Sequence, residues 1–295
     1  MITTSLVSPS ELPNLRTSKI EIAACPTFFT PFQMHTREIL QLGLNGWAGW
    51  LRDHLMSIQE LVERYRISMV VAMAHAHYSE KFTFHDSDTI KIVTTATCIK
   101  GGVLLEMPSC FFADEKEVAQ VNISLRPVTI ADDVSFGAKP SRLPSEILSL
   151  FFDQEISKSF ERPVQRLTKQ IEDQQQGECI AQERYPFILH RYAMDFADQW
   201  AFMEASAYAS ASRETLVLGQ MAQESRLKAG LSCPIKQFDI ELHRPYFLFD
   251  KGVVETKAYW WNERLVFIHS LLGYGTGLEE VYATVIEQIE PSESR

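Results

Sequence analysis

Two stretches of the chain alternate between hydrophobic and polar residues in the way that half-buried β-strands do. The first runs from His77 to Val128 and the second from His243 to Glu290. Each opens with an aromatic-rich segment that we interpret as a strand, reaches an acidic break, and continues through three alternating segments rich in β-branched residues. This pattern is typical of strands joined by short turns. We therefore predict an antiparallel meander in each half of the chain.

A long helix is predicted before each meander. In the first half, hydrophobic residues recur at steps of three and four: Trp47, Trp50, Leu51, Leu55, Ile58, Leu61, Val62 and Tyr65. This spacing places them on one face of a helix. In the second half, residues 201–221 favour a helix and are unusually rich in Ala and Ser, whose small side chains allow a curved sheet to approach closely. Each half is thus expected to be of the α+β class, with a strand, a long helix and several antiparallel strands.

The repeat predicts two domains joined by a polar segment. We expect an N-terminal tail over residues 1–17, a first domain over 18–135, a connector over 136–184 and a second domain over 185–291. The connector contains one hydrophobic helical piece, residues 142–152, and is otherwise charged and poor in aromatic residues. We interpret it as a solvated tether or surface helix.

The composition is that of a soluble protein with a hydrophobic core: of 295 residues, 45% are hydrophobic and 22% are charged. The net charge of −10 argues against a nucleic-acid or an anionic membrane partner. The five cysteines include no CxxC pair, which disfavours a disulfide framework or a zinc site and favours a reducing compartment. We find neither a signal peptide nor a bilayer-spanning hydrophobic stretch, so we expect a cytoplasmic protein.

A helix followed by a wrapping antiparallel meander, twice in one chain, resembles a tandem (double) hotdog of the superfamily of acyl-CoA and acyl carrier protein (ACP) thioesterases and dehydratases. The second half is similar to the 4-hydroxybenzoyl-CoA thioesterase-like branch, in which an Asp at a turn is followed ten residues later by a Tyr on the helix. Asp198 and Tyr208 have that spacing, although bulky residues stand between them where the branch has glycines. The pairing of two such halves also resembles double-hotdog proteins of polyketide-type biosynthetic pathways.

The resemblance implies a thioester site at the start of the second helix. The N-terminus of a helix can stabilise a developing oxyanion, and a nearby carboxylate can attack the carbonyl or deprotonate water. We predict that Asp198, just before a helix starting near Trp200, and Glu204, about one and a half turns into it, are catalytic. Tyr208 and Trp200 are expected to bind substrate. Alternatively, Asp198 is an N-cap worth about 1 kcal/mol and Tyr208 only packs.

A second polar pocket is predicted in the first half, where glycines suggest a turn at the start of the first helix. Asn45 stands there in place of a carboxylate, and His54 is an imidazole close by. Both are expected to bind substrate, unless His54 merely borders the hydrophobic face of the helix. We expect no cofactor and no metal, because His75 and His77 share a strand face but lack an evident third ligand.

The predicted function is hydrolysis of an acyl thioester, or transfer of its acyl group from CoA or ACP, in specialised-metabolite or fatty-acyl biosynthesis. One alternative is a hotdog dehydratase, decarboxylase or cyclase in which His54 works with a carboxylate of the other half. Another is a non-catalytic acyl-binding protein whose pocket is closed by Trp200, Phe202 and Met203. Basic residues that could meet a CoA phosphate or an acidic carrier are Arg191, Arg213, Arg226 and Lys228. A monomer or a homodimer is expected.

Overall fold

The computed structural model describes residues 16–99, 101–130, 138–156, 162–196, 198–275 and 277–291. Their contacts divide the chain into two compact units. The first unit takes its described residues from Met1–Ala24, Gln41–Val71 and His85–Ser159, and the second from Cys25–Leu40, Ala72–Phe84 and Phe160–Arg295. Two segments of the N-terminal half therefore pack in the second unit. The domain boundaries expected from the sequence stay a prediction.

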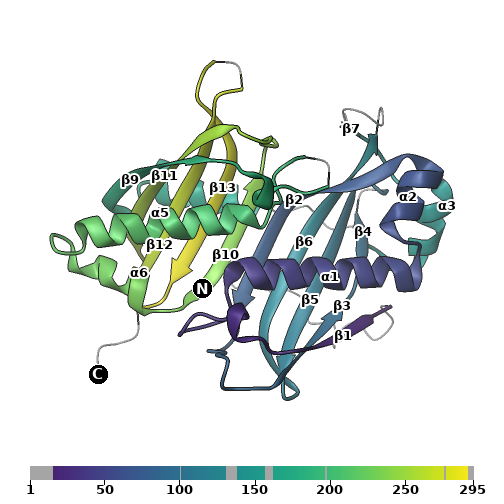
Figure 1. Cartoon of the computed structure of the whole chain (residues 1–295), viewed down its shortest axis with the longest axis horizontal. Coiled ribbons are helices and arrows are strands. Elements are labelled where there is room, and N and C mark those ends of the chain that lie inside the picture. Colours follow the sequence, from purple (N-terminus) through teal and green to yellow (C-terminus); the bar gives the residue numbers. More distant parts are fainter. Residues whose placement is uncertain are drawn as a thin grey trace. The chain divides into compact units, whose positions relative to one another are not determined.

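The first unit is built on antiparallel strands that helix α1 covers (Figure 1). In order of pairing the strands are β1 (Ser18–Ala23), β3 (Thr89–Thr94), β5 (Leu104–Ala113), β6 (Lys116–Ile130) and β7 (Ala138–Pro140). A small addition at β5 consists of β4 (Thr97–Ile99) and β8 (Glu155–Ile156). The helices are α1 (Thr36–His54), which begins in the second unit, α2 (Ile58–Tyr65), α3 (Ser145–Leu148) and η3 (Ser149–Gln154).

Glycines allow α1 to lie close to these strands. A Cβ placed at Gly46 would overlap the hydroxyl of Thr94, which is hydrogen-bonded to the Ser109 hydroxyl at 2.8 Å. The glycines thus lie inside the helix, where they allow close packing, and do not form a turn before it. The prediction that the first helix starts near Asn45 is therefore wrong, since α1 begins at Thr36.

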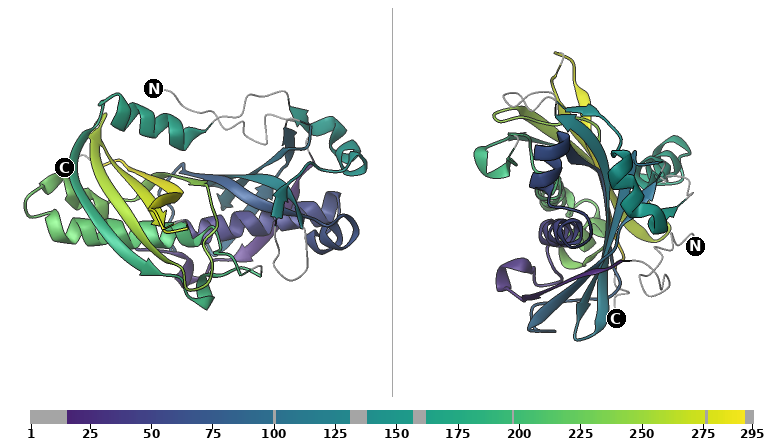
Figure 2. Two further views of the ribbon diagram at one scale, coloured as in Figure 1. Left: turned by 90° about the horizontal axis from the view of Figure 1, so that it is seen from above. Right: turned by 90° about the vertical axis from the view of Figure 1, so that its right-hand side faces the viewer.

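The second unit is a curved antiparallel sheet with helices on both faces (Figure 2). Its strands pair in the order β9 (Glu178–Ile188), β11 (Lys251–Trp261), β12 (Arg264–Gly273), β13 (Glu280–Ile289) and β10 (Ile235–Leu242). Residues 73–77 of β2 (Ile67–Tyr78) then pair with β10. The helices are η2 (Pro26–Phe28), α4 (Pro163–Thr168), η4 (Lys169–Asp173), η5 (Arg191–Ala193), α5 (Glu204–Gln220), η6 (Ser225–Lys228) and α6 (Ala229–Ser232).

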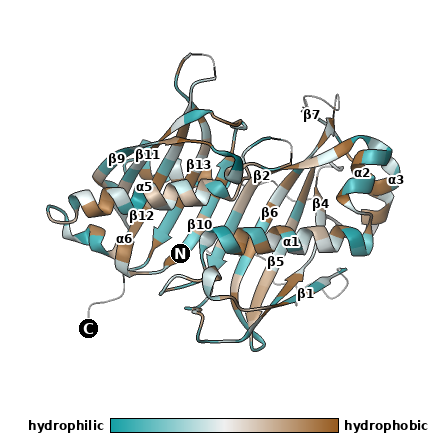
Figure 3. Cartoon of the chain, in the orientation of Figure 1, coloured by the Kyte–Doolittle hydropathy of each residue, from teal (hydrophilic) through white to brown (hydrophobic). Residues whose placement is uncertain are grey.

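Helix α5 packs on one face of this sheet through small side chains, as its composition predicted. Ala205, Ser206, Ala209 and Ser212 are buried, and the Ser212 hydroxyl lies 2.6 Å from that of Thr256 on β11. In Figure 3 helix α5 carries pale stretches between brown and teal ones. These small side chains allow a close fit of the helix to the sheet, whereas the bulkier Arg213, Leu216 and Val217 are buried further along α5.

Part of the expected connector packs on the opposite face of the same sheet. Val164, Leu167 and Ile171 of α4 and η4 are buried in a hydrophobic cluster with residues of β11, β12 and β13. Strand β9 also begins inside the range expected for the connector. Residues 163–173 are therefore a structural layer of the second unit and not a solvated tether.

The aromatic-rich segments that open the two repeats are largely not strands. Strand β2 ends at Tyr78, and residues 243–250 form a connection between β10 and β11. Their aromatic side chains nevertheless enter the interior, because Phe82 and Tyr246 are buried. Burial of alternate aromatic residues in a loop mimics the pattern of a strand, which explains the error. The three later segments of each repeat are strands, as predicted.

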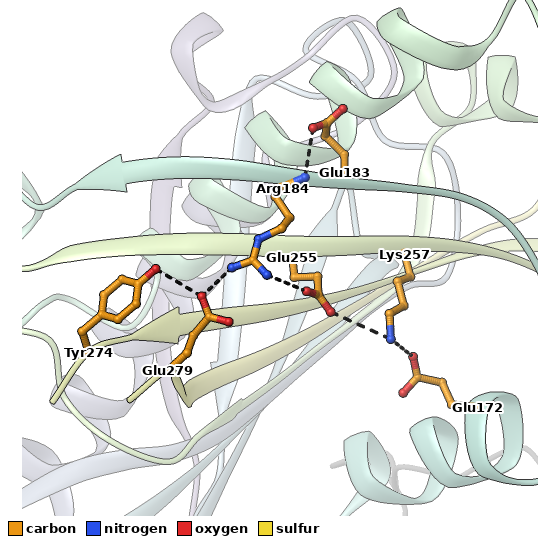
Figure 4. A network of polar contacts seen from close by, with 7 residues as sticks. All are labelled: Glu172, Glu183, Arg184, Glu255, Lys257, Tyr274 and Glu279. Atoms are coloured by element: carbon orange, nitrogen blue, oxygen red, sulfur yellow. Dashed lines mark hydrogen bonds and ion pairs between the residues drawn. The ribbon is translucent and has the colours of Figure 1, made fainter. Parts of the chain in front are cut away.

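A polar network covers part of the surface of β9 and β11 in the second unit (Figure 4). Arg184 contacts Glu255 and Glu279, and Lys257 lies 3.3 Å from Glu172. These side chains are partly exposed to solvent, so each pair contributes at most about 1 kcal/mol.

Among the described residues, no helix combines the length and the hydrophobicity that crossing a membrane requires.

Candidate functional site

Asp198 lies in the loop before α5 and does not cap that helix. Helix α5 begins only at Glu204, and Asp198 has a left-handed backbone with φ 53°. Its carboxylate pairs with Arg191 at the surface, where the Asp198 side chain is 61% exposed. The prediction of a helix starting near Trp200 is wrong because this segment pairs with another loop. The backbone N–H of Trp200 donates to the carbonyl of Tyr246 at 3.1 Å.

The space in front of α5 is filled by the protein itself. Trp200, Phe202 and Met203 are all buried. The first backbone N–H groups of the helix, at residues 204–206, donate to the carbonyls of residues 201–203. Helix N-termini bind ligands through N–H groups that lack such acceptors. The space before α5 is therefore occupied by side chains and its first N–H groups are satisfied.

Glu204 is buried at the first residue of α5, where only 4% of it is exposed, and it pairs with Arg37 at the start of α1. The Arg37 guanidinium donates to Oε1 of Glu204 from Nε at 2.8 Å and approaches it with Nη2 at 2.7 Å. This hydrogen bond to Glu204 is the main cause that raises the pKa of Arg37. Glu204 thus ties the starts of two helices together, a role that occupies its carboxylate.

Tyr208 and Trp200 belong to one aromatic cluster. The rings of Tyr208 and Phe187 stack at 4.4 Å, Phe187 meets Tyr246 at 5.5 Å, and Tyr246 meets Trp200 at 5.0 Å. Burial is the main cause that raises the pKa of Tyr208, and the neighbouring Tyr192 hydroxyl adds to it. These contacts favour the packing alternative for both residues.

A cavity of about 270 Å³ lies elsewhere in the second unit, at the start of α1. Its walls come from the loop of residues 30–36, from α5 and from residues 230–235. The α5 residues on the wall are Ser210, Arg213 and Glu214. Thr36, the first residue of α1, lines this cavity. The first N–H groups of an α-helix have no acceptor within the helix and carry partial positive charge.

Two buried side chains on this wall have polar atoms without a hydrogen-bond partner among the described residues. They are Oε1 of Gln33, a residue that is 5% exposed, and Nε of Arg213, which is 8% exposed. Leaving such a buried group unpaired costs about 1–3 kcal/mol. Buried polar atoms are nearly always paired in native proteins. These two atoms are themselves fully buried, so they lie behind the cavity surface and not on it.

A chain of buried polar groups behind the cavity holds Arg213 in place. Nη1 of Arg213 donates to Oε2 of Glu287 at 2.6 Å, and Nε2 of His269 lies 3.4 Å from the same oxygen. Thr256 lies 2.7 Å from Nδ1 of His269 and 2.6 Å from Ser212. Burial alone would raise the pKa of Glu287, but the charge of Arg213 and the contacts with His269 outweigh it and lower the pKa to about 2. The guanidinium is thus fixed against a permanent anion.

Two groups on the cavity wall could take a proton from water. The Glu214 side chain is 55% exposed, and its Oε1 lies 3.6 Å from Nη2 of Arg213. His35, just before α1, is exposed and anchored by its backbone N–H, which donates to the Phe28 carbonyl at 2.8 Å. A carboxylate or an imidazole facing a helix N-terminus is the arrangement that general-base attack of water on a carbonyl requires.

The structure does not bring Asn45 and His54 together. Asn45 is exposed on α1, where its Oδ1 lies 3.5 Å from the Gln41 amide. His54 is the last residue of α1, with Nε2 3.1 Å from the Thr17 carbonyl and its ring 5.2 Å from that of Trp50. The alternative in which His54 borders the hydrophobic helix face fits these contacts.

His75, one of the two strand histidines considered as metal ligands, has a different partner. Its Nδ1 lies 2.6 Å from Oδ1 of the buried Asp239 on the neighbouring strand. Within the described ranges, no group of three or more His, Cys, Asp and Glu residues is arranged to hold a metal ion.

The sequence analysis missed most of the cavity. Gln33, His35 and Thr36 lie in a loop without periodicity, and Glu214 was not singled out. Arg213 is predicted only as a basic residue that could meet a CoA phosphate or an acidic carrier. One signal was present, because Arg213 directly follows the small residues Ala209 to Ser212.

No family model matches this sequence, and neither does any curated protein. Several solved structures are similar. A predicted oleoyl thioesterase from Lactobacillus plantarum is 7% identical, with 95% of this chain and 98% of that chain covered and a TM-score of 0.70. The 12:0-ACP thioesterase from Umbellularia californica is 11% identical, with 94% of each chain covered and a TM-score of 0.66. An acyl-ACP thioesterase from Bacteroides thetaiotaomicron is 10% identical, with 93% of this chain and 98% of that chain covered and a TM-score of 0.61.

At these identities the likeness establishes the fold alone. The present chain shares the fold of these structures over nearly its whole length. Its large antiparallel sheet and few helices are consistent with the predicted hotdog resemblance.

Proposed function

We propose that this protein hydrolyses acyl thioesters of CoA or ACP. The observation that carries the proposal is the cavity at the start of α1, which joins a helix N-terminus and the Glu214 carboxylate in a fold shared with thioesterases. The similar structures that are described as acting on oleoyl, 12:0-ACP and acyl-ACP substrates support the thioester as the reacting group.

In the proposed reaction, N–H groups in the first turn of α1 donate to the carbonyl oxygen of the thioester and stabilise the oxyanion that forms. Glu214 takes a proton from water, and the resulting hydroxide attacks the carbonyl carbon. The carbon–sulfur bond then breaks, and the thiolate leaves and takes up the proton. The products are a carboxylic acid and the free thiol of CoA or ACP.

The sequence-based alternative assigns the reacting carboxylate to Asp198, with Glu204 as a second one. Asp198 is exposed and paired with Arg191, and Glu204 is engaged by Arg37, so Glu214 is the better supported candidate. Asp198 and Glu214 lie in different parts of the second unit, and separate variants therefore distinguish them.

The test measures thiol release from a panel of acyl-CoA and acyl-ACP substrates, with intact mass of the products. We expect Glu214→Gln to lower kcat by about 10²–10⁴-fold. Asp198→Asn and the control Glu263→Gln, at an exposed turn, should change kcat by less than about threefold. Loss of turnover in Asp198→Asn alone would place the chemistry at the α5 loop instead. No thiol release from any substrate would contradict the proposal.

We also propose the finer arrangement of two hotdog domains in tandem, over residues 18–135 and 185–291. Each unit supports it with a long helix on antiparallel strands. Acyl transfer in specialised-metabolite or fatty-acyl biosynthesis stays a prediction. The masses of the products separate the alternatives, since transfer adds the acyl group to an acceptor, while a dehydratase or decarboxylase leaves the thioester intact.

A further inference from the structure

We propose that two copies of this chain associate through an apolar surface at one end of the sheet in the second unit. The surface consists of the exposed side chains of Ile188, Tyr192, Phe247, Phe249, Tyr274 and Leu278. The proposal is independent of thioester hydrolysis, because none of these residues lines the cavity at the start of α1.

The strand register brings the segments that carry this surface to one end of the sheet. Ile188, the last residue of β9, pairs with Lys251, the first residue of β11. On the other side of β11, Gly252 pairs with Gly273, the last residue of β12. The segment after β9, the segment before β11 and the segment after β12 therefore start from adjacent positions.

Contacts between these segments hold them together. The backbone N–H of Phe249 donates to the Leu189 carbonyl at 3.0 Å, which joins the segment before β11 to the end of β9. In the segment after β12, Glu279 accepts a hydrogen bond from the Tyr274 hydroxyl at 3.1 Å and pairs with Arg184 of β9 (Figure 4). The exposed hydrophobic residues are thus gathered on one edge of the unit.

The area of the surface is large for a monomer. Its four aromatic residues are between 49% and 74% exposed. At about 150–250 Å² for each aromatic side chain, the four together expose roughly 350–600 Å². The largest apolar patch of a typical monomer measures about 300–600 Å² in total, and a stable interface takes about 800 Å² from each partner. With Ile188 and Leu278 added, the surface approaches the area that one subunit of a dimer contributes.

The charges at the border of the surface favour a second copy as the partner. Arg191 pairs with Asp198, and Arg244 pairs with Glu280, so these two cations are balanced within the chain. An acidic protein or an anionic membrane requires a basic surface, and the net charge of −10 acts against both. A dimer with twofold symmetry places the same surface of each copy against the other, and balanced border charges allow this without strong repulsion.

The apolar surface and the cavity lie at opposite ends of β10. Ile235, the first residue of this strand, lines the cavity, whereas Leu242, the last residue, leads into the segment that carries Phe247. The strand has eight residues, which span about 25 Å at about 3.3 Å per residue. Residues of the surface can therefore be exchanged without a change in the cavity wall.

The experiment measures the mass of the full chain by sedimentation velocity and light scattering. We expect a monomer–dimer equilibrium with a Kd below about 100 μM. Because the contacts are apolar, that Kd should rise by less than about threefold between about 0.1 M and 1 M NaCl. A larger rise would assign the association to charged groups and contradict the proposal. A chain that stays monomeric would overturn it, including one that instead binds vesicles of phosphatidylcholine.

Two variants locate the interface. Phe249 has a left-handed backbone with φ 67°, which Asn adopts more readily than Phe, so Phe249→Asn removes the ring and retains the turn. Phe249→Asn and Tyr192→Ser should each raise the dimer Kd by at least about tenfold. Leu218→Ser is the matched control, because Leu218 is a 64% exposed hydrophobic residue of α5 outside the surface. A Kd that is unchanged in both surface variants contradicts the assignment, and melting curves show whether each variant is folded.

The Phe249→Asn variant also separates association from the proposed hydrolysis. We expect it to release thiol with the kcat of the unmodified chain while it is monomeric. If the unmodified chain dimerises through this surface but releases no thiol, the interface stands and the hydrolase is rejected. Thiol release by a chain that never dimerises retains the hydrolase and rejects the interface.

Discussion

Glu287 keeps its charge in the interior of the second unit because Arg213 and His269 meet it there. Its pKa is lowered to about 2 from an ordinary value of 4.5. A group whose pKa is lower in the folded state stabilises the fold above its unfolded pKa, and this contribution is lost as the pH falls toward the folded pKa.

We therefore expect the free energy of unfolding to fall between about pH 5 and pH 2, in part through protonation of Glu287. Glu287→Gln should lower that free energy at pH 7 by about 3–5 kcal/mol, since it leaves Arg213 buried without its anion. The deficit should shrink toward pH 2. Urea unfolding at several pH values measures it, with Glu263→Gln as an exposed control. A deficit that does not vary with pH would contradict the role given to Glu287.

A second prediction at the scale of the residue concerns the ion pair between Arg37 and Glu204. The sequence predicts a catalytic role for Glu204, whereas its contact with Arg37 indicates a structural one. Glu204→Gln should lower the free energy of unfolding by about 1–3 kcal/mol, a range discounted for the partial exposure of Arg37. In a double-mutant cycle with Arg37→Met, the losses should be less than additive. Strict additivity would show that the pair is not coupled.

At the scale of the element, α1 and α5 contain glycines with different surroundings. Gly46 faces the Thr94 hydroxyl, whereas a Cβ at Gly219 of α5 would meet nothing within 4 Å. We expect Gly46→Ala to lower the free energy of unfolding by about 1–3 kcal/mol through overpacking. Gly219→Ala should raise it by up to about 1 kcal/mol through helix propensity. Thermal or urea unfolding of both variants measures this contrast, and equal effects would mean that α1 is not closely packed.

The starts of α1 and α5, both of which lie in the second unit, also differ in what lies before them. At α5, bulky side chains and satisfied N–H groups close the helix start, whereas the start of α1 borders a cavity. The resemblance predicts a site at the start of α5, because Asp198 and Tyr208 have the spacing that the resembling branch shows. Spacing along the chain does not report whether the space in front of a helix is filled.

At the scale of the whole molecule, the second unit is assembled from three separate parts of the chain. Residues 25–40 and 72–84 belong to it, although the internal repeat places them in the first half. The candidate cavity depends on this exchange, since its walls combine residues 30–36 with residues of α5 and the segment before β10. A comparison of two halves within the sequence treats each half as self-contained and so cannot reveal such a site.

The sequence by itself determined a long helix in each half and the three later strands of each repeat, including β11, β12 and β13, and the small residues of α5. These features depend on local periodicity and composition, which are properties of neighbouring residues. Tertiary structure decided which polar residues are buried, which helix start borders a cavity and which charges meet. Glu204 and Arg213 acquire their roles from partners far away in the chain, Arg37 and Glu287. The candidate chemistry therefore became visible only once those distant segments were packed together.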